Sequence, residues 1–132
     1  MHVTIRRLVA AFIVAVIIEA ATFAIMFDDL LYLRQPPEAI AAGSLETFER
    51  HASDALRRDR LTAHHLETMA AAARAFGRYD LEVHALERRA QQTSTDPTVQ
   101  LRVADALRRA GRLGEAEQLY LDVLERAARE SR

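Results

Sequence analysis

Apolar residues are concentrated near the N-terminus of the chain. Residues 8–27 read LVAAFIVAVIIEAATFAIMF and carry a single charged side chain, Glu19. As an α-helix this stretch is about 30 Å long, which matches the hydrocarbon thickness of a bilayer. The pattern therefore predicts a transmembrane helix over residues 8–27, within a membrane anchor that covers residues 1–34.

Charged residues flank this apolar stretch asymmetrically. Arg6 and Arg7 precede it, and Asp28 and Asp29 follow it. Because arginine is enriched on the cytoplasmic side, we expect a cytoplasmic N-terminus and a periplasmic C-terminal domain at a bacterial-type inner membrane. A cleaved signal peptide and a buried core helix are the alternatives. The run is long for a signal peptide and lacks a small-x-small site before Asp28, and the remaining chain is too small to wrap a core helix.

The charged residue of the predicted span lies near mid-membrane. An acidic side chain at this depth costs about 2.5–3.5 kcal/mol on insertion scales, so Glu19 calls for a compensating contact. Small and polar side chains share its helix face, namely Ala11, Ala15, Glu19 and Thr22. We predict that this face contacts another membrane helix. The alternative is a neutral carboxylic acid that contacts nothing in the lipid.

A proline pair separates the anchor from the rest of the chain. Gln35-Pro36-Pro37 ends the first helix and predicts a short, stiff linker at residues 35–37. Residues 38–132 show helical spacing of apolar residues and no alternating pattern, which predicts an all-α domain. We expect its helices at residues 44–58, 61–76, 79–91, 97–110 and 113–129.

Turn residues recur along this domain. Gly77-Arg78-Tyr79 and Gly111-Arg112-Leu113 each place a large apolar residue after a Gly-Arg pair, and the two glycines are 34 residues apart. Gly43 lies another 34 residues upstream and is followed by Leu45 at the equivalent position. A period of 34 residues in helical sequence is a repeat signature.

These residues resemble the tetratricopeptide repeat (TPR) family, whose unit is two antiparallel helices joined by a tight turn. The last unit matches best, with Ala104, Leu107, Gly111, Leu113, Ala116, Tyr120 and Leu124 at the family's packing positions. The preceding unit keeps Ala70, Gly77, Tyr79 and Leu86 but has Glu82 where the family has a small alanine. The Gly43 unit retains only its second helix. An unrelated small helical bundle is the alternative.

The resemblance implies an all-α fold, in which a single N-terminal transmembrane helix precedes a short TPR-like solenoid of helical hairpins over residues 38–132. Its turn and packing residues would be Gly77, Tyr79, Gly111, Leu113, Ala116 and Tyr120. In this family the stacked hairpins leave a concave groove lined by the first helix of each unit. The resemblance therefore implies binding of a protein or peptide.

Composition removes several functional classes. The 18 basic and 19 acidic residues give a net charge of -1, which argues against a nucleic-acid partner. The chain has no cysteine, so disulfides and thiol chemistry are absent. His51, His64, His65 and His84 do not form an HExxH pattern, and no phosphate-binding or nucleophile motif occurs. We therefore expect no metal, no cofactor and no catalytic site.

All of the basic residues are arginines. The pairs Arg57-Arg58, Arg88-Arg89 and Arg108-Arg109 could bind acidic partner surfaces or lipid headgroups. Acidic residues alternate with these arginines along the helices, however, which is typical of a solvated helical face with ion pairs. The second interpretation is the simpler one.

These features together predict a non-catalytic, single-pass membrane subunit. Its transmembrane helix would pack within a larger membrane complex in the bilayer, and its helical repeats would bind a periplasmic protein or peptide. An alternative is an assembly factor or chaperone that holds client proteins, as similar repeat proteins do in cytochrome c maturation. A membrane-bound enzyme is a third hypothesis, and no catalytic cluster in the sequence supports it.

Overall fold

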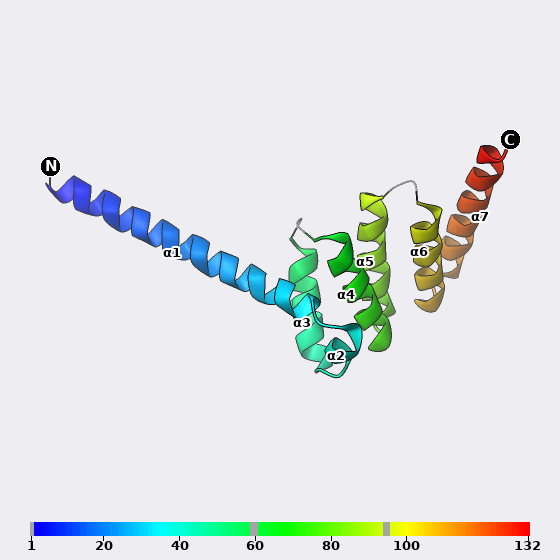
Figure 1. Ribbon diagram of the computed structural model, residues 1–132, viewed down its shortest axis with the longest axis horizontal. Coiled ribbons are helices and arrows are strands. Elements are labelled where there is room, and N and C mark those ends of the chain that lie inside the picture. Colours follow the sequence, from blue (N-terminus) through cyan, green and yellow to red (C-terminus); the bar gives the residue numbers. More distant parts are fainter. Residues whose placement is uncertain (1, 59–60, 94–95) are drawn as a thin grey trace.

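The computed structural model describes residues 2–58, 61–93 and 96–132 (Figure 1). These residues form helices and no strand, which confirms the all-helical prediction for this part of the chain. The helices are α1 (His2–Leu33), α2 (Pro37–Ala41), α3 (Leu45–Leu56), α4 (Ala63–Ala75), α5 (Tyr79–Gln92), α6 (Pro97–Arg109) and α7 (Leu113–Glu130). The five helices predicted for the domain are present, with shifts of one or two residues at their ends, whereas α1 extends six residues beyond the predicted span at each end and α2 was not predicted.

Helix α1 projects from the rest of the molecule as a long rod (Figure 1). Over Thr4–Leu33 it is long and apolar enough to cross a membrane. Its large apolar side chains are exposed along most of this length, among them Phe12, Ile17 and Phe23. Leucine, isoleucine and phenylalanine in such number on an uncovered helix require an apolar surrounding.

The junction between α1 and the domain differs from the predicted linker at residues 35–37. Pro37 already occupies the first position of α2, where its missing N–H costs nothing, and Pro36 precedes it as the N-cap. Leu33 before the prolines and Ile40 after them are both fully buried. The prolines therefore form a tight corner between two packed segments, because the chain on each side contributes to the same core.

The domain helices follow one another in space as they do in sequence. Helices α4, α5, α6 and α7 each contact the next, and α7 lies farthest from α1 (Figure 1). The largest fully buried side chains lie on α1 to α5, and they are Leu33, Ile40, Phe48, Leu66, Met69, Val83 and Leu86. The core is therefore centred on α3, α4 and α5 and is closed on one side by the last turn of α1.

Side-chain caps fix where several helices begin. The Ser44 hydroxyl accepts from the backbone N–H of Thr47 at 3.1 Å, and the Asp96 carboxylate accepts from that of Thr98 at 2.9 Å. Thr62 and His65 form a reciprocal capping box at the start of α4. These caps satisfy N–H groups that lack partners in the first turn, which explains why the polar residues before each apolar run mark the helix starts.

Candidate functional site

The face of α1 predicted to contact a membrane partner carries no contact with the domain. Ala11, Ala15, Glu19 and Thr22 are all exposed. The Thr22 hydroxyl donates to the carbonyl of Ile18 at 2.8 Å, so it is satisfied within its own helix. Among the described residues, the carboxyl group of Glu19 has neither a hydrogen bond nor an ion pair. In a bilayer this group would need either a proton or a polar partner.

The two Gly-Arg turns have the same geometry. Gly77 and Gly111 have φ angles of 70° and 78°, in the left-handed region that favours glycine. The N–H of Arg78 donates to the carbonyl of Ala73 at 2.8 Å, and that of Arg112 donates to Leu107 at 2.9 Å. This is the Schellman pattern, which ends one helix and starts the next within three residues.

The third glycine of the period does not repeat this turn. Gly43 has no positive φ, and its N–H donates to the carbonyl of Ile40 at 3.0 Å. A Cβ on Gly43 would lie 3.1 Å from the same carbonyl oxygen and 3.5 Å from the Tyr32 hydroxyl. Gly43 therefore allows α2 and α1 to approach closely, whereas Gly77 and Gly111 are needed because their backbone has a positive φ.

The predicted packing residues after these turns separate into two groups. Ala116 is 2% exposed against α6, and the Tyr120 hydroxyl donates to Asp105 of α6. This hydrogen bond, together with burial, raises the pKa of Tyr120. Tyr79 is 37% and Leu113 is 63% exposed. The packing contact expected of Leu113 is thus missing, because no helix of the described chain covers that side of α7.

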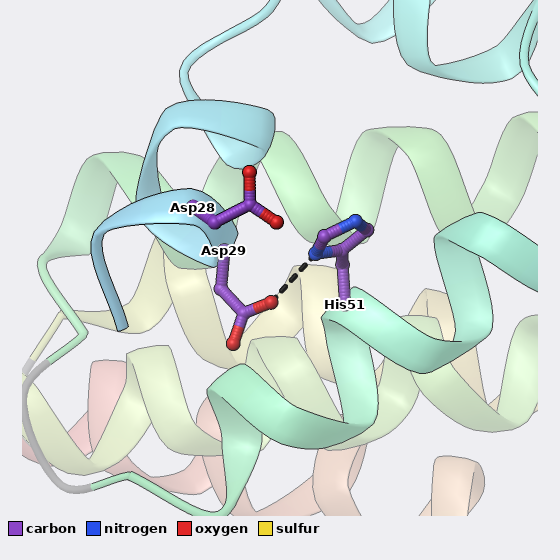
Figure 2. A group of neighbouring side chains, drawn as sticks. All are labelled: Asp28, Asp29 and His51. Carbon is purple, nitrogen blue, oxygen red and sulfur yellow. Dashed lines mark hydrogen bonds and ion pairs between the residues drawn. The ribbon is translucent and has the colours of Figure 1, made fainter. Parts of the chain in front are cut away.

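A buried ionic network that no local sequence pattern predicts joins α1 to α3. The Nδ1–H of His51 donates to Asp29 Oδ1 at 2.6 Å (Figure 2), and Arg58 lies 2.6 Å from Asp29 Oδ2. Asp29 and His51 are 4% and 7% exposed. Because a carboxylate can only accept, the proton of this hydrogen bond resides on His51. Both oxygens of Asp29 are thereby engaged.

The aromatic ring of Tyr32 completes this junction. It stacks on the His51 imidazole with ring centroids 4.3 Å apart and planes inclined by 15°. Tyr32 lies on α1 one turn after Asp29, so both residues of α1 contact the His51 side chain of α3. The last turn of α1 is therefore fixed to the domain by polar and aromatic contacts together.

Asp28 brings a third potential ligand to this position. Ligand atoms of Asp28, Asp29 and His51 lie within 4.8 Å of one another, and Figure 2 shows both carboxylates on the side of the imidazole. A divalent cation here would have to displace the hydrogen bond between Asp29 and His51. The guanidinium of Arg58 also opposes a second positive charge. The geometry therefore favours an ionic network over a metal centre.

The sequence offered only a weak signal for this network. Asp29 and Leu33 are four residues apart and share a helix face, which places a charge beside a buried leucine. His51 follows 22 residues after Asp29 on a separate helix. The distance between them depends on how α1 returns through the proline corner, and no local pattern reports that.

Glu82 also has a role that the sequence left unexplained. It is 3% exposed and accepts two hydrogen bonds from Arg109 of α6, at 3.1 and 2.5 Å. The hydrogen bond to Glu82 is the largest cause of the raised pKa of Arg109. A planar guanidinium bound by both oxygens is a specific contact. Glu82 therefore joins α5 to α6 through a salt bridge.

A groove lies between α4 and α6, with α5 as its floor. Its volume is about 240 Å³. Its lining residues are Ala70, Ala71, Arg74, Glu82, Leu86, Arg102, Asp105 and Arg109. Arg102 also reaches Glu67 of α4 at 2.6 Å, so ion pairs join both walls. Its walls, α4 and α6, are the first helices of the two hairpins that turn at Gly77 and Gly111.

Comparisons with protein families, with curated proteins and with solved structures find no match to this chain.

Proposed function

We propose that this protein is a non-catalytic, single-pass membrane subunit whose helical domain binds other proteins. The observation that carries this proposal is the continuity of α1 with the domain. An apolar rod able to cross a membrane ends in a turn whose Asp29, Tyr32 and Leu33 are packed into the domain core. A leader that is cut away before folding would have no need of such contacts.

The exposed polar face of α1 supports a partner within the membrane. Glu19 has no hydrogen bond or ion pair among the described residues, and Ala11 and Ala15 on the same face allow a second helix to approach closely. A carboxyl group in hydrocarbon gains most from a polar partner on such a helix. The subunit then belongs to a larger inner-membrane complex.

The paired helices support a binding role for the domain. Two hairpins with identical Schellman turns stack beside each other, and their first helices form the walls of a groove. We assign this domain to the TPR-like class on that arrangement, and to the periplasmic side from Arg6 and Arg7 before the span. Its partner is a periplasmic protein or peptide.

The transmembrane contact is tested by purification of the complex from native membranes. We expect Ala15→Phe and Glu19→Leu to reduce recovery of the co-purifying membrane proteins. Ala24→Phe is the matched control, because it adds the same bulk on the opposite side of α1. Unchanged recovery with both variants would remove the proposed membrane contact.

The same purification separates the proposed subunit from an assembly factor. A permanent subunit is recovered in fixed stoichiometry with the mature complex, whereas an assembly factor is enriched only with unassembled clients. A reporter fused after Arg132 tests the topology. Fluorescence of a cytosol-specific reporter at this position would contradict the proposed periplasmic domain.

A further inference from the structure

The groove between α4 and α6 has an excess of positive charge. Five arginines and three carboxylates lie in or beside it, and they are Arg74, Arg89, Arg102, Arg108, Arg109, Glu67, Glu82 and Asp105. The whole chain has a net charge of -1. The groove is therefore a local departure from a nearly neutral molecule.

Each of these carboxylates already has a cationic neighbour. Glu82 is bound by Arg109, and Glu67 lies 2.6 Å from Arg102 and 3.5 Å from Arg89. Asp105 accepts from Tyr120 and lies 4.0 Å from Arg108. Each anionic group of the groove is thus already paired with an arginine of the chain.

Arg74 is the cation that this arrangement leaves over. It is exposed on the last turn of α4 and lines the groove, and none of the described residues forms a hydrogen bond or an ion pair with it. On the same wall, the exposed Ala71 presents only a methyl group, and Ala70 before it is buried. A bound backbone can approach closely over Ala71 while its side chains reach Arg74 and the arginines of α6.

We infer that this groove binds an acidic segment of a partner protein. The inference rests on the proposed binding role of the domain and adds the chemistry of the partner. Arginine presents its donors in a planar fork that suits glutamate and aspartate side chains. A segment with several carboxylates satisfies Arg74 directly and shares the donors of Arg102 and Arg109, whereas a neutral segment leaves the excess charge uncompensated.

The test uses the full chain in nanodiscs of neutral phosphatidylcholine. The probe is a fluorescein-labelled peptide of alternating glutamate and alanine, and the comparison is the same peptide with glutamine in place of glutamate. We expect the acidic peptide to bind and the glutamine peptide to bind about tenfold more weakly or not at all. Affinity should fall with added salt, because the contacts are exposed ion pairs.

Variants locate the binding on the molecule. We expect Arg74→Ala to weaken the acidic peptide about threefold and Arg74→Glu about tenfold. Arg50→Glu is the matched control, because Arg50 is exposed on α3 and the net charge changes equally. Ala71→Trp fills the groove without changing charge and should also abolish binding, with circular dichroism as the check of folding.

Several outcomes would overturn the inference. They are equal affinity for the two peptides, equal loss with Arg50→Glu and Arg74→Glu, and unchanged binding with Ala71→Trp. None of these results depends on the Glu19 face, so a failed membrane contact and a failed groove are distinguishable.

Discussion

At the end of the domain next to α1, charged side chains are buried and bonded, whereas at the α7 end leucines are exposed. Asp29 and His51 are 4% and 7% exposed, but Leu113 and Leu124 are 63% and 64% exposed. Helix α4 has seven buried residues in its 13, and α7 has two in its 18. The usual rule of apolar inside and polar outside is thus reversed at specific places on both ends.

The difference indicates what each end is for. Burial of an acid and an imidazole is favourable only where they pair with each other and with a cation such as the partly exposed Arg58, and such a network fixes one arrangement of α1 on the domain. Exposed leucines along one side of a terminal helix instead leave surface that further helix could cover. The α1 end is therefore built for a fixed geometry, and the α7 end is left open.

The largest expected effect comes from breaking the network at the α1 end. Asp29→Ala removes the anion shared by the buried His51 imidazole and the partly exposed Arg58 guanidinium, and the loss of one partner of such a network typically costs about 3–5 kcal/mol. Denaturant unfolding of the full chain in detergent, followed by the helical circular dichroism of the domain, measures this loss. Asp28→Ala is the control, because its carboxylate is exposed and should change stability by less than about 0.5 kcal/mol. A similar small change for both variants would mean that the network does not hold α1 in place.

The salt bridge between α5 and α6 gives the next largest effect. Arg109→Leu leaves Glu82 buried without a partner, and we expect a loss of about 3 kcal/mol. Glu82→Ala should cost less, because Arg109 is partly exposed and its guanidinium can turn to water. The order of the two unfolding free energies is the measurement. If Glu82→Ala were the more destabilising change, the buried charge would not be the dominant factor at this contact.

These charged contacts mark the limit of what the sequence could predict. Helix positions in the domain and the Gly77 and Gly111 turns follow from local patterns, and they appear in the structure. The TPR-like assignment stays a prediction. Local patterns fail where residues far apart in the chain meet.

The proline corner illustrates that failure. Two prolines predict a stiff linker from local geometry alone. Whether such a corner separates two bodies or folds one onto the other depends on the burial of Leu33 and Ile40, which lie outside the proline pair. Asp29 and His51 meet only because the chain folds back, so their ionic network was equally hidden from the sequence.

His65 at the start of α4 should make the stability of the domain depend on pH, and this effect is of intermediate size. Burial lowers the pKa of His65 below its ordinary value of 6.5, and the positive charges of Arg34 and His64 lower it further. The folded state thus keeps His65 neutral, with Nδ1 near the Thr62 N–H at 3.3 Å, while the unfolded chain takes up a proton below about pH 6.5. This contribution to stability is present above pH 6.5 and is lost as the pH falls from 6.5 toward the lower folded pKa.

A substitution isolates that contribution from the other histidines. Glutamine at the same capping position keeps the reciprocal hydrogen bonds but does not titrate, so His65→Gln should remove part of the decline in melting temperature between pH 7 and pH 5. Between pH 7 and pH 5, the unfolding free energy of the wild type should fall by about 1 kcal/mol more than that of His65→Gln, which is the usual effect of losing an N-terminal cap. Parallel pH profiles for wild type and variant would place the titrating group elsewhere.

The smallest expected effect lies at the open α7 end. Leu124→Gln removes an apolar side chain that is 64% exposed, so the isolated protein should change in stability by no more than about 0.5 kcal/mol. Leu66→Ala in α4 is the contrasting substitution, because this side chain is fully buried and its loss should cost about 2–5 kcal/mol. Thermal unfolding of the two variants compares how much a leucine of α4 and a leucine of α7 each contribute to the stability of the domain. A loss above about 1 kcal/mol for Leu124→Gln in the purified protein would mean that another surface covers this side of α7 in solution. The contrast in burial between the two ends would then describe the isolated chain and not the protein as it is assembled.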